Sequence, residues 1–337
     1  MVNVTSNPPL TRLLNRSQVR SLLRWPELIE AIAQALIDAS SGESAAAASQ
    51  LHVPGAALHL KSGHLKSGHL KSGHLKSGHL KSGALGRPPV LSVKANLRPE
   101  AGGAAGLIVA FDPVGCTVRA VLDSADITAA RTGAIAAVAA RALAGPGPRR
   151  LALLGAGPVA RQSLAALSQV AELEEVRVWS RDQGRSEKIS FGTARAIAVG
   201  SVPQAVAGAD IVLTATPARE PLVTGADLGD HALILAMGAD TRGKRELGDG
   251  VLDDAELVAD VPADAAEVGE LAYLPGGPDP DRCVALGELL AGRRQLSGGK
   301  RIVFDSVGTA VADAAAVALI LATAEREQVG ALLDFAG

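Results

Sequence analysis

Short apolar runs alternate with longer segments of helical pattern through the second half of the chain. Each run is three or four residues long and rich in Val, Ile, Leu or Ala, which is too short for a helix. The runs lie at 151–154, 176–179, 196–199, 211–214, 233–236, 257–259 and 302–304. Strands that alternate with helices build a parallel sheet with helices on both faces. We therefore predict an α/β fold centred on a doubly wound parallel sheet.

The rest of the chain shows helical and hairpin patterns outside that alternation. Apolar residues recur every three to four positions over 16–39, which predicts one helix. Two apolar runs within 106–122 flank an Asp-Pro-Val-Gly turn and predict a β-hairpin. An alanine-rich helix is expected from Asp126 to about Leu143, and an Ala/Val-rich helix after residue 305. The latter is apolar on most sides, so we expect it to be buried between domains or subunits.

Five identical copies of His-Leu-Lys-Ser-Gly occupy residues 59–83. A period of five suits neither a helix face nor a strand face. Six of the seven histidines lie at 52–79, which raises metal binding as an explanation. The repeat supplies no shaped set of ligands, so we expect an exposed, glycine-broken loop and no metal site. If four copies are set aside, the flanking residues predict a hairpin whose second strand, 90–94, ends on Lys94.

A glycine-rich turn follows the first apolar run of the alternating half. Residues 151–161, LALLGAGPVAR, combine a strand, Gly155 and Gly157, and the start of a helix. In dinucleotide-binding proteins the first glycine permits the tight turn, and the second lets the backbone approach the pyrophosphate at the helix N-terminus. Ala160 takes the third position, which has to pack the helix against the strand. The segment predicts a dinucleotide site of the Rossmann type.

The end of the second strand predicts which nicotinamide cofactor binds. In this fold an acidic residue there binds the ribose 2′-hydroxyl of NAD, whereas a basic or hydroxyl residue suits the 2′-phosphate of NADP. Strand 176–179 is followed by Ser180 and Arg181, which favours NADP(H) over NAD(H). Asp182 is the alternative, because a shift of two residues would make its carboxylate the ribose ligand.

Composition argues against several other functions. The net charge of −2 and an aromatic content of 2% leave neither the basic surface nor the stacking residues that nucleic-acid binding needs. No run approaches the roughly 20 apolar residues of a membrane span. The two cysteines cannot build a disulfide framework, which fits a reducing compartment. We expect a cytoplasmic protein with no nucleic-acid or membrane partner.

Six segments together resemble one family, in the same order along the chain. They are SVKANLRP, DSADITAARTGAIAAVAARALA, LLGAGPVARQSL, VAGADIVLTATP, AMGADTRGKREL and FDSVGTAVADAAAV. On these segments the chain resembles the ornithine cyclodeaminase/μ-crystallin family from about residue 10 to its end. The resemblance implies a Rossmann domain, 127–305, inserted into a discontinuous α+β substrate and dimerisation domain, 1–126 plus 306–337. It also implies a homodimer.

The resemblance further implies chemistry at the α-carbon of an amino or imino acid. Such substrates carry a carboxylate, and Lys94 and Arg131 are the cations expected to bind it. Asp240 follows the apolar run 233–236, so we expect it at the carboxyl edge of the sheet. There it would hold the substrate ammonium or take a proton, and we predict Asp240 and Lys94 as catalytic residues. The μ-crystallin type of the family departs from aspartate at this position.

Two residues that the family's cyclodeaminases carry are missing from this chain. In place of a Pro-Pro-Arg-like segment the chain has ASQLHVP at 48–54, and in place of Glu-Met-Pro it has ALHLK at 57–61. Some family dehydrogenases have a His-x-Lys-x-Gly segment here instead. We therefore expect either the first copy of the repeat or its last, through His79 and Lys81, to bind substrate. The differences weigh against an ornithine cyclodeaminase in particular.

These observations predict an NAD(P)-dependent oxidoreductase that transfers hydride at the α-carbon of a small amino or imino acid. The alternatives are a cyclodeaminase that releases ammonia while NAD is transiently reduced, and a non-catalytic NADPH- or ligand-binding protein of the crystallin type. The predicted cofactor-binding residues are Gly155, Gly157, Pro158, Val159, Ala160, Ser180, Arg181, Thr214, Thr216, Met237, Gly238, Thr132 and Ser306. The predicted substrate-binding residues are Lys94, Arg131, His79 and Lys81.

Overall fold

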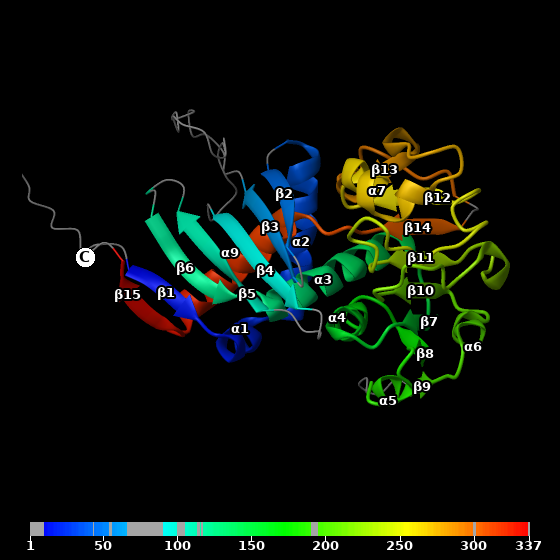
Figure 1. Cartoon of the computed structure of the whole chain (residues 1–337), viewed down its shortest axis with the longest axis horizontal. Coiled ribbons are helices and arrows are strands. Elements are labelled where there is room, and N and C mark those ends of the chain that lie inside the picture. The colour runs from blue at the N-terminus through cyan, green and yellow to red at the C-terminus, as the bar shows by residue number, and fades with distance from the viewer. Residues whose placement is uncertain are drawn as a thin grey trace, which may run out of the picture. The chain divides into compact units, whose positions relative to one another are not determined.

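The computed structural model describes residues 10–42, 44–53, 56–65, 90–99, 105–112, 115, 117–189, 195–298 and 301–335. The chain divides into two compact units, whose elements are labelled in Figure 1. The first unit takes both ends of the chain, 1–31, 41–128 and 310–337, and the second takes 32–40 and 129–309. In sequence, the second unit is therefore inserted into the first, and one boundary falls within helix α3 (Ala125–Leu143).

A mixed sheet of seven described strands forms the first unit, in the order β15-β1-β6-β5-β4-β3-β2. The strands are β1 (Leu10–Leu14), β2 (Ser44–Val53), β3 (Ala56–Leu65), β4 (Leu91–Pro99), β5 (Ala105–Asp112), β6 (Thr117–Asp123) and β15 (Ala331–Asp334). Neighbours are antiparallel except β1 and β6, which are parallel. The hairpin predicted for 106–122 is confirmed by β5 and β6. The antiparallel pairing predicted around the repeat is confirmed by β3 and β4. The loop predicted for 59–83 is wrong for residues 59–65, which belong to β3.

Helix α9 (Ala310–Arg326) packs against β2, β3 and β4 of this sheet. Most of its residues are buried, and the sequence is dominated by alanine and branched apolar side chains. Small side chains let a helix lie close to a sheet, so the apolar pattern is explained by packing within the first unit. None of the helices in the described part of the chain is long and apolar enough to cross a bilayer.

The single helix predicted for 16–39 is wrong. Two helices occupy the segment, α1 (Arg16–Leu22) and α2 (Trp25–Ser40). Leu23 is extended, with φ −73° and ψ 128°, and ends α1. Pro26 lies in the first turn of α2, where a residue without an N–H costs no helical hydrogen bond. The proline marks a helix start that the apolar spacing obscured.

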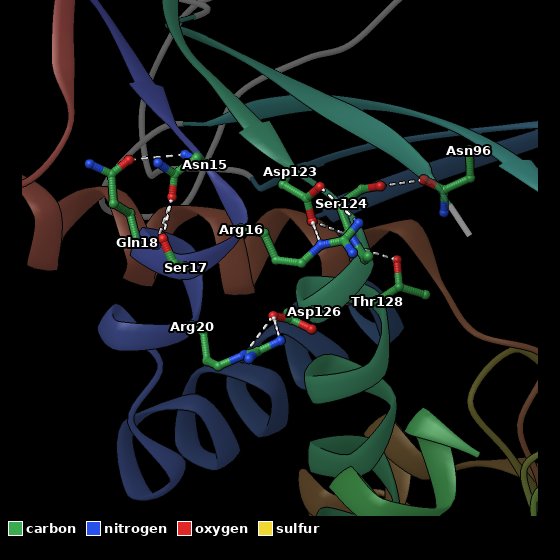
Figure 2. Close-up of polar contacts among 11 residues, drawn as sticks. Asn15, Arg16, Ser17, Gln18, Arg20, Asn96, Asp123, Ser124, Asp126 and Thr128 are labelled. Atoms are coloured by element: carbon green, nitrogen blue, oxygen red, sulfur yellow. Dashed lines mark hydrogen bonds and ion pairs between the residues drawn. The ribbon is translucent and has the colours of Figure 1, made fainter. Parts of the chain in front are cut away.

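Two ion pairs attach α1 to the last residue of β6 and to the first turn of α3 (Figure 2). Arg16 binds both oxygens of Asp123 with nitrogen–oxygen distances of 3.0 and 3.1 Å. Arg20 binds Asp126 at 2.9 Å. All four side chains are within reach of solvent, so each pair is worth at most about 1 kcal/mol. They link α1 to the start of α3 and add little to stability.

An all-parallel sheet of eight described strands forms the second unit, in the order β13-β12-β14-β11-β10-β7-β8-β9. The strands are β7 (Arg149–Leu154), β8 (Leu173–Trp179), β9 (Arg195–Ala198), β10 (Ile211–Thr214), β11 (Leu233–Ala236), β12 (Glu256–Ala259), β13 (Cys283–Ala285) and β14 (Ile302–Asp305). The helices are α4 (Pro158–Leu167), α5 (Gln183–Ser186), α6 (Val202–Val206), α7 (Pro262–Val268) and α8 (Leu286–Leu290), with short 3₁₀ turns η1 (Gly225–Asp227), η2 (Glu270–Tyr273) and η3 (Pro280–Arg282). The predicted doubly wound sheet is confirmed, with β13 as an unpredicted edge strand.

The strand order places a binding crevice at a defined point of this sheet. Strand β7 lies between β10 and β8, and the chain winds outward from it in both directions. The described strands β10 and β11 are buried along their whole length, as expected for strands covered on both faces. Ligands of such sheets bind beyond the carboxyl ends of the strands where the winding reverses. Here that point lies after β7, β8 and β10.

Candidate functional site

The turn after β7 has the backbone shape that a phosphate-binding glycine turn needs. Gly155 has φ +126°, a conformation that residues with a side chain rarely adopt. A Cβ at Gly155 would lie 2.5 Å from the carbonyl oxygen of Ala215 in the turn after β10. Two turns from different strands therefore meet at Gly155, and glycine is required there for sterics as well as for φ.

The start of α4 leaves room for a ligand. Gly157 is the N-cap of α4, no side chain caps the helix there, and Pro158 takes the first helical position. A Cβ on Gly157 would meet nothing within 4 Å, so this glycine faces open space and not protein. Backbone N–H groups at a helix start have no partner within the helix and attract anions. The fully buried Ala160 fills the third position of the motif. These features fit a dinucleotide pyrophosphate.

A cavity of about 540 Å³ lies beside this turn, entirely within the second unit. Its walls come from the glycine turn, the end of β8 and the segment after β10. The predicted cofactor residues that line it are Gly155, Gly157, Ser180, Arg181 and Thr216. Sequence reasoning missed Trp179 and Arg185, which also line it. The volume and the position agree with a ligand site at the carboxyl edge of the sheet.

The residues that the sequence analysis linked to cofactor preference lie together at this cavity. Strand β8 ends at Trp179, and Ser180 follows it directly. Ser180 Oγ donates to the carbonyl of Asp182 at 2.7 Å, which holds the loop in a tight bend. Arg181, Asp182 and Arg185 are all exposed on the cavity wall. Two guanidinium groups and one carboxylate are therefore available to a cofactor ribose.

Two of the three threonines predicted to contact cofactor, Thr214 and Thr216, share one partner that the sequence analysis missed. Thr214 Oγ1 donates to Glu246 Oε2 at 2.8 Å, and Thr216 donates to Oε1 through both its N–H and its hydroxyl, each at 2.7 Å. The N–H of Gly238 donates to Oε2 at 2.9 Å. Thr216 lines the cavity, whereas Thr214 is fully buried. Next to Gly238, Met237 is also buried.

Asp240 lies in the turn after β11, as the sequence predicts. Its Oδ1 is 2.5 Å from Lys244 Nζ and accepts a hydrogen bond from the hydroxyl of Thr241 at 3.0 Å. Lys244 also donates to the carbonyl of Gly238 at 3.2 Å. The Asp240 side chain is 28% exposed, so its carboxylate is paired but still accessible. Lys244 is a neighbour that sequence reasoning did not identify.

Lys94 lies within β4. The strand was predicted to end at Lys94, but it continues to Pro99. Its Nζ is 2.7 Å from the carboxylate of Asp313 on α9 and 3.4 Å from Thr128 Oγ1. The Lys94 and Asp313 side chains are 2% and 1% exposed. A buried cation thus has a fixed anionic partner within the first unit. The sequence signal for Asp313 is a lone acidic residue inside an alanine-rich segment.

Arg131 is buried on α3, and its guanidinium lies against Gly308. A Cβ at Gly308 would lie 2.5 Å from Arg131 Nη1, and the positive φ of +79° also favours glycine. Thr132, the next residue, is buried as well. Ser306 Oγ donates to Asp260 Oδ2 at 2.8 Å, so this predicted cofactor contact is also part of a buried hydrogen-bond network.

The last copy of the repeat, with His79 and Lys81, lies outside the described residues. The first copy, 59–63, forms part of β3 and pairs with β4. In that register Lys61 is the partner of Lys94. Of the two copies considered from the sequence, the first is therefore the one that the sheet aligns with a predicted substrate residue.

Comparisons with known proteins agree with the fold and the motifs. The model of the ornithine cyclodeaminase/mu-crystallin family matches residues 11–328. Ketimine reductase mu-crystallin of Mus musculus is 35% identical over 214 residues, which is 63% of this chain and 67% of the relative. L-lysine cyclodeaminase of Streptomyces rapamycinicus is 35% identical over 235 residues, 67% of each protein. An archaeal alanine dehydrogenase dimer with bound NAD superposes with a TM-score of 0.84 at 24% identity, covering 97% of this chain and 99% of the other. The chain belongs to the ornithine cyclodeaminase/mu-crystallin family.

Proposed function

We propose that this chain is an NAD(P)-dependent oxidoreductase that transfers hydride at the α-carbon of a small amino or imino acid. The open space at Gly157, at the start of α4 and beside a cavity of about 540 Å³, carries the proposal because it fits a dinucleotide. Relatives that are a ketimine reductase, an alanine dehydrogenase and a lysine cyclodeaminase support chemistry on an amine or imine. When bound, the nicotinamide supplies or accepts the hydride.

We assign the substrate carboxylate to Lys94 and Arg131. Arg131 offers a planar fork for a bidentate contact, and Lys94 offers a point charge. The Asp313 carboxylate 2.7 Å from Lys94 Nζ holds that ammonium in place. Asp240 binds the substrate ammonium, or takes its proton as the imine forms, in exchange for its contact with Lys244. The first repeat copy, at 59–63, is our choice over the last for a further substrate contact.

We propose NADP(H) as the preferred cofactor. Arg181 and Arg185 line the cavity with Ser180, and two guanidinium groups suit a 2′-phosphate. An R181A/R185A variant should bind NADPH at least tenfold more weakly, since each charge-assisted hydrogen bond is worth about 1.5–3 kcal/mol, and should bind NADH nearly as before. If NAD is preferred, a D182A variant should bind NADH more weakly and NADPH nearly as before. Fluorescence titration of both variants with both cofactors decides between the two.

We also propose a homodimer and a cytoplasmic location. The related alanine dehydrogenase structure is a dimer. Large apolar side chains are exposed on and beside the edge strand β15 and its neighbour β1, namely Leu10, Leu332, Leu333 and Phe335. Cys283 is a buried free thiol, which fits a reducing compartment. Sedimentation equilibrium tests the assembly.

The test of the activity is incubation with a panel of amino acids, and of keto acids with amines, while NAD(P)H absorbance and ammonia are both followed. A net absorbance change that depends on substrate is the expected result. Ammonia release without a net absorbance change would identify a cyclodeaminase, the activity of the Streptomyces relative. Cofactor binding without turnover on the whole panel would favour a binding protein of the crystallin type.

A further inference from the structure

Glu246 is a fully buried carboxylate that the proposed chemistry leaves without a role. It lies eight residues after Gly238, beyond the turn that carries Asp240. Its two oxygens accept four hydrogen bonds of 2.7–2.9 Å, from Thr214, Thr216 and Gly238. A carboxylate has acceptor sites for about four such bonds, so its capacity is filled.

The four donors come from two segments at the carboxyl edge of the sheet, namely the end of β10 with the turn after it and the turn after β11. Thr214 and Thr216 belong to the end of β10 and the turn after it, and Gly238 belongs to the turn after β11. Thr216 lines the cofactor cavity with its neighbours Ala215 and Pro217. One side chain therefore holds together two turns, one of which is a wall of the cavity.

The hydrogen bonds to Glu246 require a carboxylate at position 246 and a glycine at position 238. Two of the four donors are backbone N–H groups, which cannot rotate to become acceptors. A glutamine would direct an NH₂ group at one of them, and two donors would then face each other. Gly238 is also constrained, because a Cβ there would overlap Glu246 Oε2 and lie 2.5 Å from the carbonyl of Thr216.

The backbone at Glu246 is held by a second buried carboxylate, Glu270. Its backbone N–H donates to Glu270 Oε1 at 2.7 Å, and the N–H of Leu247 donates to Glu270 Oε2 at 3.1 Å. Glu270 is fully buried, and the N–H of Leu271, the residue after it, donates to Asp305 Oδ2 at 2.9 Å. Asp305 ends β14, so the chain of contacts runs back to the sheet. We call Glu246 and its hydrogen bonds to Thr214, Thr216 and Gly238 the clamp. Hydrogen bonds through Glu270 and Asp305 connect this clamp to the sheet.

We propose that Glu246 is a positioning residue for the cofactor, because it fixes the wall formed by Thr216 and its neighbours against the turn that carries Asp240. The role rests on the proposed function and acts through Thr216 and Gly238 without contact between Glu246 and the reacting atoms. It predicts that loss of the clamp weakens cofactor binding more than it weakens substrate binding.

The test is fluorescence titration of E246Q, T214V and the matched control E256Q with NADH and NADPH. Glu256 also accepts a backbone N–H, from Gly298 at 2.8 Å, but lies at the amino end of β12, the opposite edge of the sheet. E246Q should raise the cofactor Kd about tenfold or more, the factor expected when a buried donor loses its acceptor. At saturating cofactor the substrate KM should change less than threefold. E256Q should bind as wild type does.

T214V keeps the proposal testable if E246Q does not fold. Thr214 does not line the cavity, so a change in cofactor Kd in this near-isosteric variant has to pass through Glu246. A rise of about threefold or more is expected. Wild-type Kd in a folded E246Q, or in T214V when E246Q is unfolded, overturns the positioning role. If the wild type binds neither cofactor, the proposed function itself fails, and this role with it.

Discussion

Substitution of Asp313 by asparagine tests the buried ion pair that holds Lys94. The two side chains are 2% and 1% exposed, and the carboxylate lies 2.7 Å from Nζ. Loss of one member of a buried pair costs about 3–5 kcal/mol, because the remaining charge stays desolvated without its counterion. The Arg16–Asp123 pair offers the matched contrast, since its side chains are 48% and 22% exposed. A pair of that kind is worth at most about 1 kcal/mol.

The assay is urea unfolding of D313N and D123N beside the wild type, with the first unit's transition followed by circular dichroism. D313N should lose about 3 kcal/mol or more and D123N less than about 1 kcal/mol. D313N should also raise the KM for the amino or imino acid, because the ammonium that binds the carboxylate is no longer held. A double variant, K94M/D313L, should regain stability without activity. A D313N loss below about 1 kcal/mol, or equal losses in D313N and D123N, would refute the reasoning.

Three further predictions concern other parts of the chain. Gly157→Val should raise the Kd for NAD(P)H at least tenfold with little change in stability, because the valine side chain would enter open space and not protein. Isothermal titration measures the Kd, and a thermal melt measures the stability. Burial, reinforced by the charge of Glu246, raises the pKa of Glu270 to about 8. The folded state therefore binds more protons than the unfolded state between about pH 4.5 and 8. Wild-type stability should fall relative to that of E270Q as the pH rises through this window. If the melting temperatures of the two proteins change in parallel from about pH 5 to 8.5, the prediction is contradicted. Deletion of 64–83 leaves one repeat copy and joins Gly63 to Ala84. The variant should preserve cofactor binding and turnover, since the first copy keeps its pairing with β4. Loss of turnover in a folded deletion variant would show that further copies are needed.

The sequence predicted the second unit well because its signals are local. Parallel strands are buried on both faces, so 211–214 and 233–236 appear as runs that are apolar except for Thr214, with the bounds that β10 and β11 have. The glycine turn is equally local, since Gly155 and Gly157 are read from a few adjacent residues. In the first unit the repeat obscured the strand pattern, and the strand thought to end at Lys94 extends to Pro99.

The supporting residues were missed because their partners are distant in sequence. Glu246 binds Thr214 across 32 positions, and Asp313 binds Lys94 across 219 positions. No periodicity links such residues, and only the folded sheet order brings them together. Arg185 is different, since it lies four positions after Arg181 and was available as a second basic residue on the same loop.

Strand β3 draws its sequence from a tract whose units are interchangeable. It takes one whole copy of His-Leu-Lys-Ser-Gly and the first two residues of the next, at 59–65. A change in the number of copies would lengthen or shorten the tract by whole units of five residues. Because every unit is the same, each resulting chain would still present His-Leu-Lys-Ser-Gly-His-Leu to β4 in an unchanged register, provided that two units remain. The number of copies can therefore change without changing the residues that this strand pairs with β4.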